Sequence, residues 1–199
     1  TPYNQHELPQ VYEFAESISA QLQYTAYMFP PTRTACNAHF TRFSAEEAGR
    51  ATAAYVALKR KPEELAAFCK AMLTAAVPRA EECAEINDGV RCRAGRAAYW
   101  VTYDGKMLPC GMIPSLNASI LDEGFSAAWQ RCVSMFANVK APKGCISCEH
   151  YNHCDVCPAI CHAENGDFSV VPEYICQKNS TYRSALAKIV EETETNSCV

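Results

Sequence analysis

The chain has 199 residues, 20% of them charged, and a formal net charge of −4 at pH 7. This length allows one or two small domains with modest cores. The acidic balance, with no basic stretch, argues against nucleic acids and anionic membrane surfaces as partners. No apolar run reaches the roughly 18 residues typical of a membrane-spanning helix, and Thr1 opens the chain without a secretory signal.

The 13 cysteines restrict the kind of protein further. A secreted disulfide scaffold is usually a small chain with an even number of cysteines, whereas this number is odd and the chain is not small. Repeated C-x2-C pairs favour metal or cluster binding instead. We therefore expect a cytoplasmic protein that binds metal through its thiolates.

The N-terminal 30 residues predict one helix followed by one strand. Apolar side chains recur at helical spacing from Leu8 to Ile18. A β-rich run then covers residues 22–29 and ends at Pro30. Helix followed by strand is one repeat of an α/β fold.

A helical hairpin is predicted between residue 44 and about residue 76. Ser44 can cap a helix whose first turn carries Glu46 and Glu47. Pro62 suits the first turn of a second helix. Cys69 falls on the apolar face of that second helix, so we expect it to be a core thiol.

A β-hairpin is predicted from residue 98 to residue 110. Asp104 and Gly105 between two β-rich runs indicate a two-residue type I′ turn, in which the glycine adopts a positive φ. Cys92 precedes the first strand and Cys110 ends the second. The hairpin therefore brings two thiols that are distant in sequence toward one site.

Two more helices are predicted from apolar spacing, over residues 125–136 and 182–192. Cys132 lies on the apolar stripe of the first, so we expect it in the core. Cys36 lies in a loop without an assigned role, and Cys198 lies in a terminal tail.

The most informative stretch is short, polar and turn-rich, with five cysteines at the spacing C-x2-C-x5-C-x2-C-x3-C: Cys145, Cys148, Cys154, Cys157 and Cys161. Such a segment has no hydrophobic core of its own, so disulfides or metal must hold it. A C-x2-C pair is too tight for an ordinary structural disulfide, and structural zinc satisfies this run taken alone. His150, His153 and His162 are alternative ligands, but the thiols suffice, so we expect the histidines to face solvent or to form hydrogen bonds.

The full cysteine pattern is C-x12-G-x4-C, a gap, the dense run, a second gap and a last cysteine. It resembles the SPASM domain, the C-terminal extension of radical SAM enzymes that mature peptides and proteins. The pattern of that family is C-x(9–15)-G-x4-C, gap, C-x2-C-x5-C-x3-C, gap, C. The resemblance covers Cys83 to Cys176. It departs in the dense run, where Cys157 and Cys161 stand in place of one family cysteine.

The resemblance implies an α+β fold, in which a partial α/β barrel remnant precedes a cysteine-rich SPASM-like domain. In that domain a β-hairpin and helices surround two iron–sulfur clusters. The implied boundaries are residues 1–80 for the barrel remnant and helical linker, 81–180 for the auxiliary-cluster domain, and 181–199 for a C-terminal helix and tail.

The first 30 residues resemble late repeats of the radical SAM barrel, where similar strand ends face the SAM pocket. This likeness assigns Asn4 and Tyr27 to SAM binding. The C-x3-C-x2-C motif that defines radical SAM enzymes is absent, so we expect no catalytic residue in this chain. We expect a fragment of a longer enzyme, inactive alone, and the longer enzyme would contain SAM and a third [4Fe–4S] cluster.

The resemblance also distributes the thiols over two auxiliary [4Fe–4S] clusters. The implied distal cluster has four ligands: Cys145, Cys148, Cys154 and Cys176. The implied proximal cluster draws on five candidates: Cys92, Cys110, Cys157, Cys161 and Cys83. Of the two cysteines at this departure, we favour Cys161 as the ligand that crosses to the proximal cluster.

The implied function is electron transfer through these clusters together with positioning of a peptide or protein substrate. The implied electron donor is a ferredoxin or flavodoxin. The sulfatase-maturing branch, which makes formylglycine, carries an aspartate where this chain has Gly111, so we favour peptide-crosslinking chemistry. A zinc-binding interaction module and a self-contained ferredoxin-like carrier remain alternatives.

Overall fold

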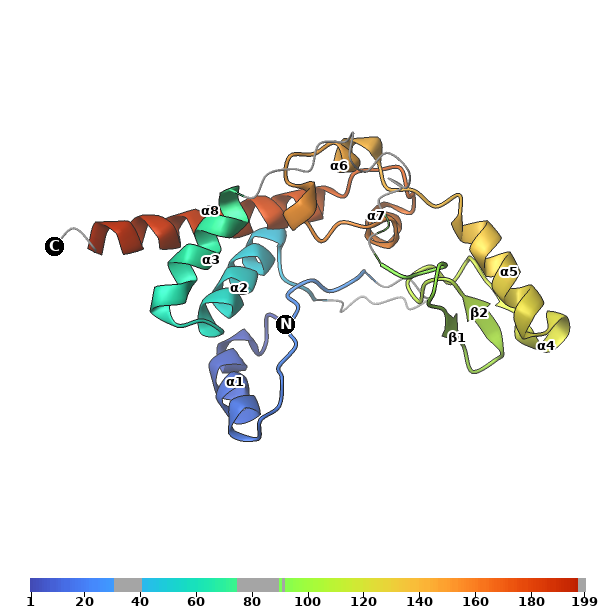
Figure 1. The fold of residues 1–199 in the computed structure, drawn as a ribbon, viewed down its shortest axis with the longest axis horizontal. Coiled ribbons are helices and arrows are strands. Elements are labelled where there is room, and N and C mark those ends of the chain that lie inside the picture. Colours follow the sequence, from blue (N-terminus) through green and yellow to red (C-terminus); the bar gives the residue numbers. More distant parts are fainter. Residues whose placement is uncertain (31–40, 75–89, 91, 197–199) are drawn as a thin grey trace. The chain divides into compact units, whose positions relative to one another are not determined.

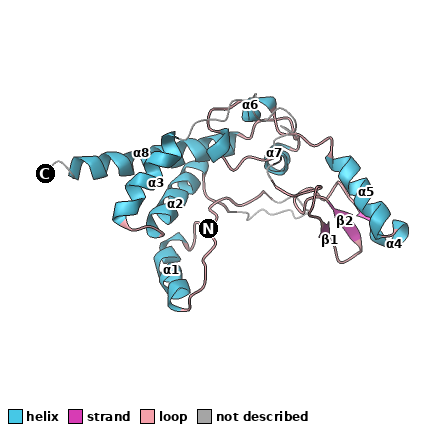
Figure 2. Cartoon of the chain, viewed as in Figure 1, coloured by secondary structure: helices cyan, strands magenta, loops and turns pink. Residues whose placement is uncertain are grey.

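The computed structural model describes residues 1–30, 41–74, 90 and 92–196 (Figure 1). Cys36, Cys83 and Cys198 lie outside these ranges, so the predictions for them are not addressed. The described chain combines many helices with one small sheet (Figure 2).

The chain divides into two compact units. The first unit comprises Thr1–Met28, Cys36–Ala76 and Glu173–Val199, and the second comprises Phe29–Ala35 and Val77–Pro172. The C-terminal helix thus belongs with the N-terminal helices, a division that differs from the expected boundaries at residues 80 and 180.

The first unit is helical. Its elements are a short 3-10 helix and four α-helices: η1 (Gln5–Glu7), α1 (Leu8–Ser17), α2 (Ala45–Leu58), α3 (Pro62–Thr74) and α8 (Glu173–Asn196). The long helix α8 packs against both α2 and α3 (Figure 1). Ala53, Cys69, Tyr182 and Leu186 form the buried centre of this packing. The prediction that Cys69 is a core thiol is therefore confirmed.

Helix α2 begins where its sequence predicts, because Ser44 and Glu47 form a capping box. The Glu47 backbone N–H donates to Ser44 Oγ at 3.2 Å, and the Ser44 N–H donates to Glu47 Oε2 at 2.8 Å. These bonds satisfy two of the N–H groups that a helix start leaves without partners. They also lower the pKa of Glu47.

Two expectations for the first unit were wrong. Residues 20–30 form no strand, since a strand needs a second strand to supply its hydrogen bonds and the described residues supply none there. Helix α8 begins at Glu173, directly after Pro172, rather than at residue 182. Cys176 therefore lies in a helix, where it is exposed.

The second unit contains the sheet and the cysteine-rich loops. Its strands are β1 (Trp100–Val101), β2 (Lys106–Leu108) and β3 (Ala118–Ser119), joined antiparallel in the order β1-β2-β3. Its helical elements follow in chain order: α4 (Ile120–Glu123), α5 (Phe125–Phe136), α6 (Lys143–Ile146), η2 (Tyr151–His153) and α7 (Pro158–Asn165).

The hairpin is present, but its turn differs from the predicted type. The Gly105 N–H donates to Thr102 O at 3.0 Å, and the Thr102 N–H donates to Lys106 O at 2.9 Å. Of the turn residues only Gly105 has a positive φ, +77°. This arrangement is a three-residue loop with a glycine bulge rather than a two-residue type I′ turn, which needs positive φ at both central residues.

One face of the sheet packs against α5. Met107 and Ala118 from the sheet join Ala128 and Cys132 from the helix in one buried cluster. Cys132 Sγ also lies 3.2 Å from Met107 O, to which it donates a weak hydrogen bond. The prediction of Cys132 as a core thiol is confirmed. Within the described ranges, no helix has the length and apolar character that crossing a membrane requires.

Gly49 on α2 lies so close to α8 that a side chain would not fit. A Cβ placed on Gly49 would lie 2.6 Å from Lys178 O and 2.9 Å from Tyr182 N. We expect Gly49→Ala to lower the free energy of unfolding by about 1–3 kcal/mol, although alanine is the better helix former. Thermal unfolding followed by circular dichroism measures this, with the exposed Arg50→Ala as the control in the same helix. A raised melting temperature for Gly49→Ala would contradict the close packing.

Candidate functional site

The first C-x2-C pair sits in a series of tight turns. The Cys148 N–H donates to Cys145 O at 3.1 Å, and the Cys154 N–H donates to Tyr151 O at 3.3 Å. The His150 N–H donates to Cys148 Sγ at 3.4 Å. A turn that closes from the second cysteine onto the first presents both thiols to a common side. Backbone N–H groups that donate to sulfur are among the interactions that tune metal thiolates.

Cys157 and Cys161, where the chain departs from the family pattern, lie one helical turn apart. Cys157 is the N-cap of α7, and the Cys161 N–H donates to Cys157 O at 3.1 Å. Positions four residues apart lie on one face of a helix. The segment between them is thus helical, and both thiols lie along the same face.

Cys157 lies near the two hairpin cysteines. Burial raises the pKa of Cys157, while hydrogen bonds from the Ala159 and Ile160 backbone act in the opposite direction and the neighbouring Cys110 and Cys92 thiols raise it further. Cys110 likewise has its pKa raised, first by burial and then also by Cys92. Cys92, Cys110 and Cys157 therefore form one set, called here the first thiol group.

Cys161 lies near a different thiol. Burial, followed by the charges of Cys145 and Cys157, raises the pKa of Cys161 to about 12. Cys145 and Cys161, both buried, are called here the second thiol group. Cys157 lies near members of both groups, so the helical turn from Cys157 to Cys161 connects them.

An apolar cluster lies beneath the first thiol group. Val90, Ile113, Phe136, Val139 and Ala159 are buried together, and Cys110 and Cys157 pack against them. The Met112 and Ile113 backbone groups hydrogen-bond to Cys110, as those of Ala159 and Ile160 do to Cys157. Each thiol thus has apolar surroundings on one side and backbone donors aimed at its sulfur.

Two histidine nitrogens beside the thiols are buried without a hydrogen-bond partner among the described residues: His153 Nε2 and His162 Nδ1. His153 adjoins Cys154 in sequence, and His162 adjoins Cys161. Burying such an atom without a partner costs about 1–3 kcal/mol. Imidazole nitrogens, like thiolates, are common metal ligands. The expectation that these two histidines face solvent or form hydrogen bonds does not hold for these atoms.

Among residues 1–30, 41–74, 90 and 92–196, no three histidine, cysteine or acidic side chains lie close enough together to hold one metal ion. Four thiolates around one zinc ion must lie close together. The thiolates of an iron–sulfur cubane bind different irons and lie farther apart. A zinc site and an iron–sulfur cluster thus differ in the thiol spacing that they require.

Three of the predicted site residues belong to the first unit: Cys176, Asn4 and Tyr27. Cys176 belongs to the first unit, whereas the two thiol groups belong to the second. Asn4 lines a small groove of about 340 Å³ in the first unit, together with residues of the 22–25 segment. Tyr27 does not line that groove; it is buried, with its ring 5.9 Å from that of Tyr174. Of the two predicted SAM-pocket residues, Asn4 therefore lines this groove and Tyr27 does not.

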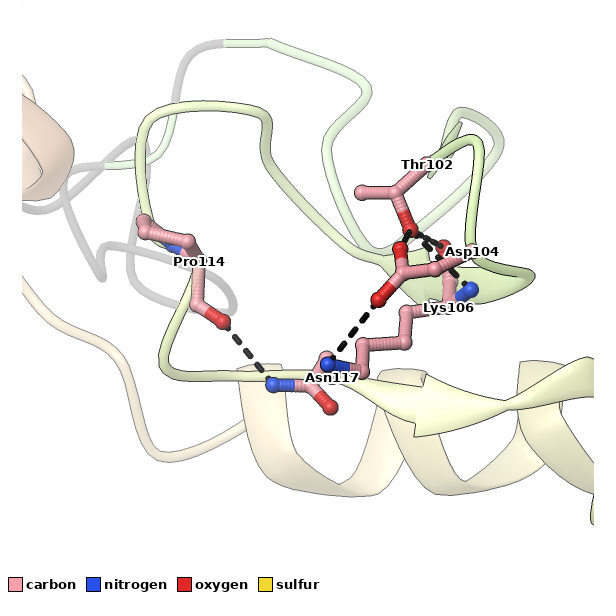
Figure 3. Close-up of polar contacts among 5 residues, drawn as sticks. All are labelled: Thr102, Asp104, Lys106, Pro114 and Asn117. Atoms are coloured by element: carbon pink, nitrogen blue, oxygen red, sulfur yellow. Dashed lines mark hydrogen bonds and ion pairs between the residues drawn. The ribbon is translucent and has the colours of Figure 1, made fainter. Parts of the chain in front are cut away.

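A second cavity, which the sequence did not reveal, adjoins the first thiol group. It has a volume of about 750 Å³ and is lined by the hairpin and the segment after it, including Cys110. Figure 3 shows polar side chains along it: Lys106 Nζ lies 3.1 Å from Asp104 Oδ2, and Asn117 Nδ2 donates to Pro114 O at 2.9 Å. The aromatic residues of the hairpin are the sequence feature that could have indicated a cavity. The spacing of these residues in the sequence does not show that they lie beside Cys110.

Trp100 lies against Gly111 at the edge of this cavity. A Cβ on Gly111 would lie 3.1 Å from Cδ2 of the Trp100 indole ring. An aspartate at this position would need the ring to move. Gly111 is thus matched to the aromatic ring that covers it.

No protein-family model matches the chain, and no solved structure matches it. Over 81 residues the chain is 32% identical to a protein from Methanosarcina barkeri (strain Fusaro / DSM 804) named AdoMet-dependent heme synthase. The match covers 39% of this chain and 23% of that protein, so the shared region is less than a quarter of the relative. A relative that depends on AdoMet fits membership of the radical SAM family.

The thiol environments predict different reactivities toward an alkylating reagent. Cys92 is exposed, whereas Cys161 is buried and its pKa is raised to about 12. Because the thiolate is the nucleophile, we expect iodoacetamide to modify Cys92 at least about tenfold faster than Cys161 in the reduced, metal-free chain. Peptide mass spectrometry measures both rates, with Cys69 as an internal control for a buried core thiol. Equal rates at Cys92 and Cys161 would contradict the burial described.

Proposed function

We propose that this chain is the auxiliary-cluster part of a radical SAM enzyme, comparable to a SPASM domain. One observation carries the proposal: Cys92, Cys110 and Cys157, from three separate segments, lie near one another although up to 65 positions apart. The AdoMet-dependent relative supports the same class. Under this proposal residues 1–80 contain the end of the enzyme's partial barrel, and Asn4 and Tyr27 belong to its SAM pocket.

The first thiol group holds the proximal [4Fe–4S] cluster in this proposal, with Cys83 as the candidate fourth ligand. The distal cluster uses Cys145, Cys148, Cys154 and Cys176, as the family pattern implies. The structure supports Cys157 over Cys161 for the proximal cluster, since Cys157 lies near Cys92 and Cys110 while Cys161 lies near Cys145.

When bound, such clusters supply one-electron transfer at potentials set by burial and by hydrogen bonds to their sulfurs. The chain's own residues provide both influences. The apolar cluster beneath Cys110 and Cys157 excludes water, and backbone N–H groups donate to both thiolates. A ferredoxin or flavodoxin is the proposed electron donor, and SAM and a third cluster belong to the complete enzyme.

The proposed substrate is a peptide or protein. The sulfatase-maturing branch carries an aspartate where this chain has Gly111. The Trp100 ring lies against Gly111 and would have to move for an aspartate side chain to fit, so we disfavour formylglycine formation. The name of the relative favours a second candidate, AdoMet-dependent heme formation, in which the same clusters would serve a tetrapyrrole substrate.

The rival from another class is a zinc-binding module without catalytic activity. It needs four close ligands around one ion. Among the residues that the structure describes, no three histidine, cysteine or acidic side chains lie close enough to hold one ion. Cys145 to Cys161 still carry enough thiols for zinc, so metal analysis must decide.

Ligand variants test the proposal. We expect Cys110→Ala to lower the iron and acid-labile sulfide of anaerobically reconstituted protein by about half, since one of two clusters loses a ligand. Cys132→Ala is the matched control, because Cys132 is a buried thiol outside both groups. Zinc in place of iron in the parent protein, or equal iron in both variants, would exclude the assignment.

The same assay separates Cys157 from Cys161. We expect Cys157→Ala to change the electron paramagnetic resonance signal that Cys110→Ala also changes, because both residues belong to the first thiol group. Cys161→Ala should leave that signal in place. The reverse result would assign the proximal cluster to Cys161 instead.

A further inference from the structure

The cavity beside Cys110 lies on the face of the sheet opposite α5. Successive side chains of a strand point to opposite faces. Met107 packs on α5, so its neighbours Lys106 and Leu108 face the other way, and pairing with Leu108 places Trp100 on their side. These side chains form the floor of the cavity, and the segment that carries Cys110 and Met112 bounds it.

The outer edge of β1 borders this cavity and pairs with no strand among the described residues. Thr102 uses its N–H to bond Lys106 O across to β2. In an antiparallel ladder the inward-bonding residues alternate with residues whose N–H and C=O point outward. Val101 is therefore the residue of β1 that presents its backbone donor and acceptor to the outer edge.

The charge of the cavity limits what it can bind. Its lysine, Lys106, is paired with Asp104 at 3.1 Å, so the two charges cancel. The Thr102 hydroxyl donates to Asp104 as well. A ligand with several carboxylates, such as a tetrapyrrole, would find no unpaired cation in this lining. An uncharged ligand with apolar side chains matches it.

Apolar surface is available where such a ligand would lie. Trp100, which lines the cavity, is 64% exposed although it belongs to a strand. The volume of about 750 Å³ is large enough for several side chains. Exposed aromatic residues beside an unpaired edge are typical of surfaces that bind an extended peptide.

We propose that the β1 edge binds an uncharged, extended peptide segment as an added strand, with alternate side chains of that peptide in the cavity beside Cys110. This inference rests on the proposed function, since it places the substrate peptide next to the proximal cluster. Val101 supplies the backbone pairing, and Trp100 supplies the apolar contact. Trp100 is thus a specificity-determining residue rather than a catalytic one.

The test uses the reconstituted full chain and an uncharged probe, acetyl-Ser-Val-Tyr-Val-Ser-amide. Calorimetry measures its binding, and hydrogen–deuterium exchange measures protection of the Val101 amide. The control probe is the same peptide with alternate backbone nitrogens methylated, which removes its edge-pairing donors. Trp100→Ala is compared with Phe14→Ala, because Phe14 is 65% exposed but lies on α1 and does not line this cavity.

We expect the unmodified probe to bind, to protect Val101 and to bind about tenfold more weakly to Trp100→Ala, with Phe14→Ala unchanged. We expect the methylated probe to bind at least about tenfold more weakly to the parent chain, a result that needs no variant to fold. Equal binding of the two probes, or no binding of either, would overturn the inference. So would binding of iron protoporphyrin IX that depends on Trp100 when the peptide does not bind.

Iron and acid-labile sulfide are measured on the same samples. Protein with its full iron that binds neither probe overturns this inference and leaves the cluster assignment intact. Protein that binds the peptide but contains zinc without sulfide overturns the cluster assignment and leaves the strand-addition site.

Discussion

The burial of its thiols is the physical constraint on which our account of the second unit rests. Cys145 and Cys161 are both buried. Burial raises the pKa of Cys161 to about 12, so without metal it is a neutral thiol that contributes little beyond its small volume. A bound metal group would replace the proton, and its binding energy would then be part of the folding energy of these loops. The buried nitrogens His153 Nε2 and His162 Nδ1 lie in the same unit and have no hydrogen-bond partner among the described residues.

The segment after the hairpin and helix α7 together carry cysteines of both thiol groups. Cys110 lies two residues after β2, so the segment after the hairpin both carries a candidate ligand and lines the cavity. The three-residue turn at Gly105 sets the register of the hairpin, and the register decides that Trp100 and Leu108 share a face. Helix α7 contributes Cys157 at its start and Cys161 one turn later, so one short helix connects the two thiol groups.

Much of the local structure was predictable from the sequence. Ser44 and Pro62 placed two helix starts correctly, because capping and the fixed φ of proline act within one turn. Cys69 and Cys132 were identified as core thiols from their helical spacing. The cysteine spacing also distinguished these two core thiols from the candidate ligands. In the structure, Cys69 and Cys132 lie in apolar clusters and belong to neither thiol group.

The predictions from the sequence were wrong where tertiary contacts, rather than local sequence, determine the secondary structure. The segment 22–29 has a β-rich composition, but the described residues offer it no pairing partner. Helix α8 starts nine residues earlier than predicted, since its first turns pack with Tyr174 and Ile175 partly or fully buried. The turn at Asp104-Gly105 has the sequence of a two-residue turn, yet hydrogen bonding from Thr102 extends it to three. The cavity beside Cys110 depends on the fold of the segment after the hairpin. No local sequence pattern predicts that fold.

X-ray absorption at the iron and zinc edges tests the central claim most directly. For the anaerobically purified chain we predict an iron spectrum with sulfur neighbours at about 2.3 Å, the usual metal–thiolate distance, together with a second shell of iron neighbours. The iron–iron shell exists only in a cluster. A zinc spectrum with four sulfur ligands and no metal–metal shell would contradict the account and assign these thiols to structural zinc.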